Sequence, residues 1–240
     1  MISKQTISEL TRKYQTTEDN IAREYCQHLF LSSLYQKRLA SEIMFKGGTA
    51  LRIIYHSPRF SGDLDFTCRN IKFKNLETVI LETAEEVAKT GIEVDIEESR
   101  QTSGGYLAIV SFNFLNFRQS AQIEISLRQS ARVKPEINLI NSDYLPPFNV
   151  VSLPEKILAK EKVAALLARA KPRDFFDIYF LLRSDLSAKK GELKLNKVFD
   201  KLESVEIDFK KELGPLLPRS HQAILRDFSS VLRREIKKYL

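Results

Sequence analysis

Apolar and polar residues repeat with two different periodicities along the chain. Residues 6–36 repeat apolar positions at helical spacing, and Thr17 stands where a helix N-cap is expected. Short alternating runs then predict strands with helices between them. The predicted strands are Met44–Phe45, Asp63–Cys68, Ile92–Glu97, Tyr106–Phe114 and Gln122–Leu127, and the predicted helices between them are Thr49–Tyr55 and Asn75–Lys89.

The pair Pro146–Pro147 marks the expected boundary between two parts of the chain. Beyond it the pattern is helical to the end, with Pro154 and Pro172 near the starts of two helices, where proline is tolerated. We therefore predict an α+β fold. A mixed sheet with helices occupies residues 1–147, and an all-α unit occupies residues 148–240.

Composition narrows the class of protein. The chain has 240 residues, of which 43% are hydrophobic, enough for one large domain or two small ones. It contains no apolar run of about 18 residues and no apolar core near its first residue, so we expect neither a membrane span nor a signal peptide. Cys26 and Cys68 show no metal-ligand spacing. A cytoplasmic protein without structural zinc is expected.

The net charge of +7 is unevenly distributed. Residues 1–150 carry 18 Lys and Arg against 18 Asp and Glu, and residues 151–240 carry 20 against 13. A basic C-terminal part favours a polyanionic partner, although lysines on solvated helix faces would give the same count.

Two glycines, Gly47 and Gly48, lie between Lys46 and Thr49 at the start of a predicted helix. Backbone N–H groups at such a start can bind an anion, and glycine lets the backbone approach a nucleoside triphosphate closely. The Thr49 hydroxyl or amide would then contact a phosphate oxygen. The alternative is a tight turn in which Thr49 is an ordinary helix cap.

Three carboxylates lie on predicted strands. Asp63 and Asp65 are two residues apart and so share one strand face, where their oxygens could hold Mg²⁺. Glu124 could complete a metal cluster or act as a general base. The alternative is that all three are exposed strand residues, but the preceding glycine pair makes the metal interpretation more specific for the two aspartates.

A second group of charged residues follows in the helical part. Lys162 and Arg169 share a helix face, and Arg173, Asp174 and Asp177 occupy the first turns of the next helix. The cations could neutralise a triphosphate, with Asp174 or Asp177 orienting one of them or taking part in catalysis. The alternative is a salt-bridged corner between two helices.

These segments resemble a known family. Residues 47–52 (GGTALR) and 59–66 (RFSGDLDF), followed by the charged block 161–177, are similar to the signatures of the AbiEii/AbiGii-type toxins. These are nucleotidyltransferase-like proteins of the DNA polymerase β superfamily. The resemblance implies a nucleotidyltransferase-like mixed sheet in the first part of the α+β fold.

The resemblance also implies a function. Such proteins are toxins of bacterial toxin–antitoxin or abortive-infection systems, bind a nucleoside triphosphate with Mg²⁺, and have a separately encoded antitoxin partner. Some transfer nucleotides to the acceptor end of tRNA, which blocks translation.

The resemblance assigns roles by position. The residues expected to hold the triphosphate are Gly47, Gly48 and Thr49, with Ser61 near by. Asp63 and Asp65 are expected to hold Mg²⁺, Lys162 to contact the β- or γ-phosphate, and Asp174 or Asp177 to complete the essential set.

Three functional hypotheses remain. The first is a Mg²⁺-dependent nucleotidyltransferase acting on RNA, most plainly tRNA. The second changes the acceptor to a protein or a small molecule. The third is a non-catalytic toxin that binds nucleotide or RNA.

Overall fold

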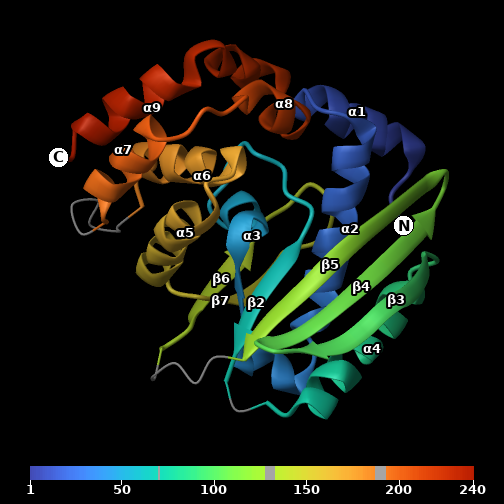
Figure 1. Ribbon diagram of the computed structural model, residues 1–240. Helices are drawn as coiled ribbons and strands as arrows, with labels where there is room; N and C mark the ends of the chain where they lie inside the picture. The colour runs from blue at the N-terminus through green and yellow to red at the C-terminus, as the bar shows by residue number, and fades with distance from the viewer. Residues whose placement is uncertain (70, 128–132, 187–192) are drawn as a thin grey trace. The chain divides into compact units, whose positions relative to one another are not determined.

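The computed structural model of the protein describes residues 1–69, 71–127, 133–186 and 193–240 (Figure 1). Its elements, in chain order, are α1 (Lys4–Tyr14), α2 (Glu18–Leu34), η1 (Arg38–Glu42), β1 (Ile43–Lys46), α3 (Gly47–Ile53), β2 (Leu64–Cys68), α4 (Phe73–Ala88), β3 (Glu93–Thr102), β4 (Gly105–Phe114), β5 (Phe117–Leu127), β6 (Glu136–Ile140), β7 (Phe148–Ser152), α5 (Glu155–Arg169), α6 (Pro172–Arg183), α7 (Leu195–Glu203), α8 (Phe209–Leu213), η3 (Gly214–Leu216), η4 (Arg219–Asp227) and α9 (Phe228–Lys237).

Residue contacts divide the chain into two compact units. The sheet unit comprises residues 1–56 and 60–153, and the helical unit comprises residues 57–59 and 154–240. The division therefore falls after Leu153, whereas the sequence predicts it after Pro147. The cause is β7, which follows the proline pair and pairs with both β6 and β1. The sequence predicts helix throughout residues 148–240, and this prediction is wrong for Phe148–Ser152, which form β7.

Within the described residues, seven strands form one mixed sheet in the order β3-β4-β5-β2-β1-β7-β6. The central strand β2 runs antiparallel to β1 and parallel to β5. Every strand expected from the alternating pattern is present, and β6 and β7 add two that the pattern did not reveal. A run as short as that of β7 does not distinguish a strand from a helix by periodicity alone.

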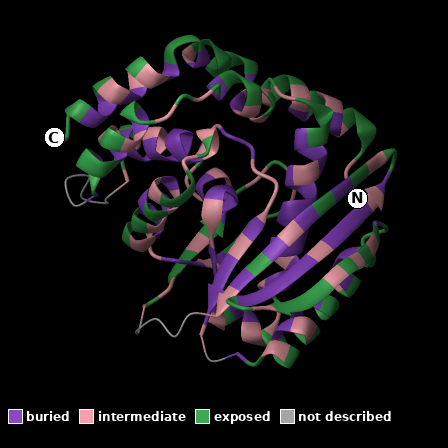
Figure 2. Ribbon diagram, in the orientation of Figure 1, coloured by how far each residue is buried: buried purple, intermediate pink, exposed green. Residues whose placement is uncertain are grey.

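Helices α2 and α4 cover one face of the sheet, as Figure 1 shows. The strands turn apolar side chains to this face, and along β5 buried residues alternate with exposed or partly exposed ones (Figure 2). Phe45, Leu64, Phe66 and Ile123 are completely buried there. Thr17 caps α2 as predicted, because its hydroxyl accepts a hydrogen bond from the Asn20 amide at 3.2 Å.

The helical unit has its own aromatic core. Phe228 of α9 packs with its ring centroid 4.7 Å from that of Phe209 and 6.0 Å from that of Phe176. Pro172 opens α6 and Pro154 caps α5, so both prolines lie at the helix starts where the sequence places them. No helix among the described residues is both long and apolar enough to cross a bilayer.

Candidate nucleotidyl-transfer site

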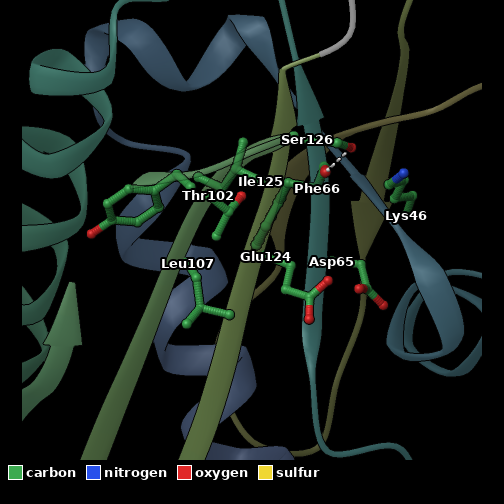
Figure 3. Close-up of a pocket in the computed structure, with 10 residues that line it drawn as sticks. Lys46, Asp65, Phe66, Thr102, Leu107, Glu124, Ile125 and Ser126 are labelled. Carbon is green, nitrogen blue, oxygen red and sulfur yellow. Dashed lines mark hydrogen bonds between the residues drawn. The ribbon is translucent and has the colours of Figure 1, made fainter. Parts of the chain in front are cut away.

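Three charged residues lie in one row across the centre of the sheet. Lys46 of β1 pairs in register with Asp65 of β2, and Asp65 pairs with Glu124 of β5. Because paired residues share a sheet face, all three project from the face opposite Phe66. They line a cavity of about 370 Å³, in which the Asp65 and Glu124 carboxylates lie side by side (Figure 3).

Gly47 approaches the Asp65 carboxylate so closely that no side chain fits between them. Its φ is +85°, a left-handed conformation that favours glycine, and a Cβ built on it would lie 2.0 Å from Asp65 Oδ2. The Gly47 backbone and the Asp65 carboxylate are thus brought together at the β1–α3 junction. The group that Gly47 approaches here is Asp65, and the predicted approach of the glycine backbone to a nucleoside triphosphate stays a prediction.

Thr49, Asp63 and Ser61 have other contacts. Thr49 is completely buried, and its hydroxyl donates a hydrogen bond to the main-chain carbonyl of Asp63. The hydroxyl thus fixes the residues before β2, and the backbone amide is what remains for the predicted phosphate contact. The Ser61 and Gly62 carbonyls both accept hydrogen bonds from Gln27 Nε2, at 2.8 and 2.9 Å.

The two aspartates are not equivalent. β2 begins at Leu64, so Asp63 precedes the strand, and the residues that line the cavity include Asp65 and Glu124 but not Asp63. Across the described residues, no three His, Cys, Asp or Glu side chains gather into a metal cluster. Within that part of the chain Asp63, Asp65 and Glu124 do not form one group of three, and their roles as Mg²⁺ ligands stay a prediction. Asp65 and Glu124 nevertheless lie in register on neighbouring strands and offer the hard oxygen donors that suit Mg²⁺.

In the helical unit, Asp177 binds two cations. Arg59 donates to its carboxylate from Nε at 2.8 Å and from Nη2 at 3.0 Å, and Lys162 Nζ donates at 2.7 Å. The three residues are 1%, 3% and 7% exposed, in the order Asp177, Arg59 and Lys162. Burial alone would raise the pKa of Asp177, but the charges and hydrogen bonds of the two cations outweigh it and lower the pKa.

Asp174 closes the corner between α5 and α6. Arg169 donates to its two oxygens at 2.8 and 2.7 Å, and the Lys171 amide donates to it at 3.2 Å. Arg173 lies 3.8 Å from Glu212 in a partly exposed pair. These contacts match the alternative of a salt-bridged corner for Asp174 and Arg169. The contact between Asp177 and Lys162 matches the other interpretation, in which a carboxylate orients a cation.

Arg59 and Gln27 are the site residues that sequence reasoning missed. Arg59 stands in the 59–66 segment without an assigned role, and its partner Asp177 is 118 positions away. Gln27 contacts residues 34 and 35 positions away. No local spacing connects either residue to its partner. An arginine four residues before Asp63 in the 59–66 segment is the sequence signal that could have drawn attention to Arg59.

Comparison with known proteins decides the family. Residues 29–238 match the model of the nucleotidyl transferase AbiEii toxin, type IV toxin–antitoxin system. The chain belongs to the AbiEii family. This confirms the resemblance and makes the protein a nucleotidyl transferase toxin of a type IV system, for which the family implies a separate antitoxin.

Solved structures confirm the predicted α+β, nucleotidyltransferase-like fold of this AbiEii protein. MenT4, a nucleotidyltransferase toxin from Mycobacterium tuberculosis, superposes with a TM-score of 0.69 at 18% identity, covering 98% of this chain and 89% of MenT4. JHP933 from Helicobacter pylori superposes with a TM-score of 0.52 at 21% identity, covering 93% and 95%. No curated protein matches the sequence.

Proposed function

We propose that this AbiEii protein transfers a nucleoside monophosphate from a nucleoside triphosphate to the 3′ acceptor end of tRNA, with Mg²⁺ as cofactor, and so blocks translation. The observation that carries the proposal is the row of Lys46, Asp65 and Glu124 with Gly47 against Asp65. A cation, two adjacent carboxylates and a close-packed glycine backbone are the groups that nucleotidyl transfer requires.

The triphosphate binds through the backbone of Gly47 and Gly48 and the ammonium of Lys46. Asp65, together with Asp63 or Glu124, would hold Mg²⁺, which supplies positive charge to the oxygens of the transferring group. By resemblance to the family, Lys162 contacts the β- or γ-phosphate. Its ammonium is fixed by Asp177, which lies 2.7 Å away.

In the transfer step, the 3′-hydroxyl oxygen of the acceptor forms a bond to the α-phosphorus. The bond from that phosphorus to the bridging oxygen breaks, and pyrophosphate leaves with the electron pair. Glu124 accepts the hydroxyl proton, a role open to it because its side chain is exposed and lines the cavity. The basic excess of residues 151–240 favours RNA as the acceptor over a small cationic molecule.

The test is a labelling assay. Purified protein is mixed with total tRNA, Mg²⁺ and each α-labelled nucleoside triphosphate in turn, beside Asp63→Asn and Asp65→Asn. Asp95→Asn is the matched control, because Asp95 is an exposed strand aspartate on β3 and does not line the cavity. We expect labelled tRNA with the wild type and the control, and none with Asp63→Asn or Asp65→Asn.

Failure to label tRNA with any nucleotide would remove tRNA as the acceptor and turn the search to protein targets. Stabilisation by a nucleotide in a thermal-shift assay without turnover on any acceptor would favour a non-catalytic toxin.

A further inference from the structure

Residues 60–63 lead directly into the strand that carries Asp65. They belong to no helix or strand, since β2 begins at Leu64, and Asp63 is the last of them. Asp65 is placed by the pairing of β2 with β1 and β5, whereas strand pairing does not place Asp63. The side chains that bind the main chain of residues 60–63 therefore determine where the Asp63 carboxylate lies relative to that of Asp65.

Gln27 of α2 holds two consecutive peptide groups of this segment. Its Nε2 donates hydrogen bonds to the main-chain carbonyl oxygen of Ser61 at 2.8 Å and to that of Gly62 at 2.9 Å. A side-chain amide nitrogen carries two hydrogens, so one donor is available for each carbonyl. The Gly62 carbonyl belongs to the peptide bond that joins Gly62 to Asp63. Gln27 therefore fixes the main chain directly before Asp63.

Burial of the Gln27 side chain shows that its amide is there for these contacts. The residue is 2% exposed. Burying an amide costs free energy unless its donors are hydrogen-bonded, and the donors here bond to Ser61 and Gly62. An apolar side chain of similar length would avoid that cost. The segment that Gln27 holds, rather than the packing of α2, thus accounts for a glutamine at this position.

Helix α3 contacts the same segment at both of its ends. The Thr49 hydroxyl donates to the Asp63 carbonyl, and the Arg52 guanidinium lies 4.0 Å from the centre of the Phe60 ring, in a cation–π contact. Thr49 and Arg52 are three residues apart and so lie on one side of α3. Arg52 is fixed in turn by Glu24 of α2, whose Oε1 accepts a hydrogen bond from Arg52 Nε at 2.6 Å. Two helices thus hold residues 60–63 in place.

These contacts fix the segment more firmly than a plain connection between a helix and a strand requires. We infer that Gln27 is a positioning residue, whose amide sets the place of the Asp63 carboxylate and, through it, the binding of a divalent cation and the rate of transfer. The inference rests on the proposed function, and within it on Asp63 joining Asp65 as a ligand of the cation. Gln27 acts only through Asp63, because its side chain is buried and its amide nitrogen is bound to two main-chain carbonyls.

The experiment measures binding of Mn²⁺ alone to the full chain by electron paramagnetic resonance, because Mn²⁺ takes the same oxygen ligands as Mg²⁺ and is observed directly. Gln27→Met keeps the length of the side chain but removes both donors. It should weaken Mn²⁺ binding about tenfold, and Asp63→Asn should weaken it at least as much. In the Asp63→Asn background, Gln27→Met should weaken Mn²⁺ binding no further, because the carboxylate through which Gln27 acts is already lost.

Gln119→Met is the matched control. Gln119 is a second buried glutamine of the sheet unit, 5% exposed, and its Nε2 donates to Asp19 of α2 at 3.1 Å rather than to residues 60–63. Both methionine variants should lower the thermal midpoint, but Gln119→Met should keep the wild-type affinity for Mn²⁺ and the wild-type rate of transfer. In the tRNA labelling assay, Gln27→Met should lower kcat at least about tenfold and leave the KM for tRNA unchanged.

Four results would overturn the inference. They are no Mn²⁺ binding by the wild type, wild-type affinity in Gln27→Met, an equal loss in Gln119→Met, and a further loss when Gln27→Met is added to Asp63→Asn. Absence of transfer by the wild type would instead refute the proposed function, and Mn²⁺ binding would still decide the role of Gln27. Should Gln27→Met fail to fold, Gln27→Asn decides by the same measurements, because it keeps a polar amide but is one methylene too short to reach both carbonyls.

Discussion

Replacing Gly47 with alanine tests the close approach between the β1–α3 junction and Asp65. The added methyl group would meet Asp65 Oδ2 at 2.0 Å and the Cβ and Cγ atoms of Asp65 at 2.7 Å. Real Cβ contacts are essentially never shorter than 3.0 Å, so the carboxylate must move by about 1 Å. Gly91→Ala is the matched control. Gly91 has a φ of +88°, close to the +85° of Gly47, but nothing lies within 4 Å of the position that its added methyl group would take.

The two variants separate backbone strain from displacement of the carboxylate. A side chain in the left-handed region costs about 1–2 kcal/mol, and both variants should lose this much stability. Only Gly47→Ala also moves Asp65. A misplacement of about 1 Å in a catalytic group can lower a rate about 100-fold, so we expect a loss of that order in transfer activity for Gly47→Ala alone.

Urea unfolding measures the free energy of unfolding of both variants, and the tRNA labelling assay measures transfer. Gly91→Ala should be destabilised but fully active per folded molecule. If Gly47→Ala keeps wild-type activity, or if the two variants lose activity equally, the contact between Gly47 and Asp65 does not position the carboxylate and the reasoning fails.

Further predictions concern the remaining charged residues. Asp177→Asn leaves the buried Lys162 ammonium without its counter-ion and should cost about 3–5 kcal/mol in urea unfolding. The pKa of Asp177 is lowered from 3.8 in the folded protein. Its ionised carboxylate therefore contributes fully to the free energy of unfolding above pH ~4, and the contribution is lost as the pH falls through the folded-state pKa. A wild-type free energy of unfolding that does not change below pH ~4 would contradict this. Asp174→Ala removes a helix cap and the carboxylate partner of Arg169, and should lower the free energy of unfolding by about 1–3 kcal/mol. Arg173→Ala breaks a partly exposed ion pair and should change that free energy by less than about 0.5 kcal/mol. Glu124→Gln should slow transfer at least about 100-fold without changing the thermal midpoint, and unchanged transfer would exclude Glu124 as the base.

The sequence predicts the sheet well where alternation is strong. The long strands β4 and β5 follow runs that alternate or are continuously apolar, and the inward positions Leu64, Phe66 and Ile123 are all buried. It misses β6 and β7, and β7 directly follows a proline pair that indicates a boundary. Pairing with β1 makes β7 a strand, and that partner is distant in sequence.

The sequence predicts only part of the site, because contacts between residues distant in sequence determine the rest. Alternation places Asp65 and Glu124 on the exposed faces of their strands, but only the parallel β2–β5 register brings them side by side. Asp63 falls before β2 because the strand begins one residue later than its pattern implies. The ion pair of Arg59 with Asp177 joins residues 118 positions apart, and nothing in local spacing encodes it.

The assignment of residues 57–59 to the helical unit has a consequence for how this toxin can be divided. The chain passes from the sheet unit to the helical unit before residue 57, returns after residue 59, and passes over again after residue 153. A fragment beginning at residue 154 would lack Arg59 and leave the Asp177 carboxylate with one of its two cations. The gene therefore has no single position at which a cut would separate two complete modules. Recombination that exchanged one unit between related toxins would have to carry both pieces of the chain together.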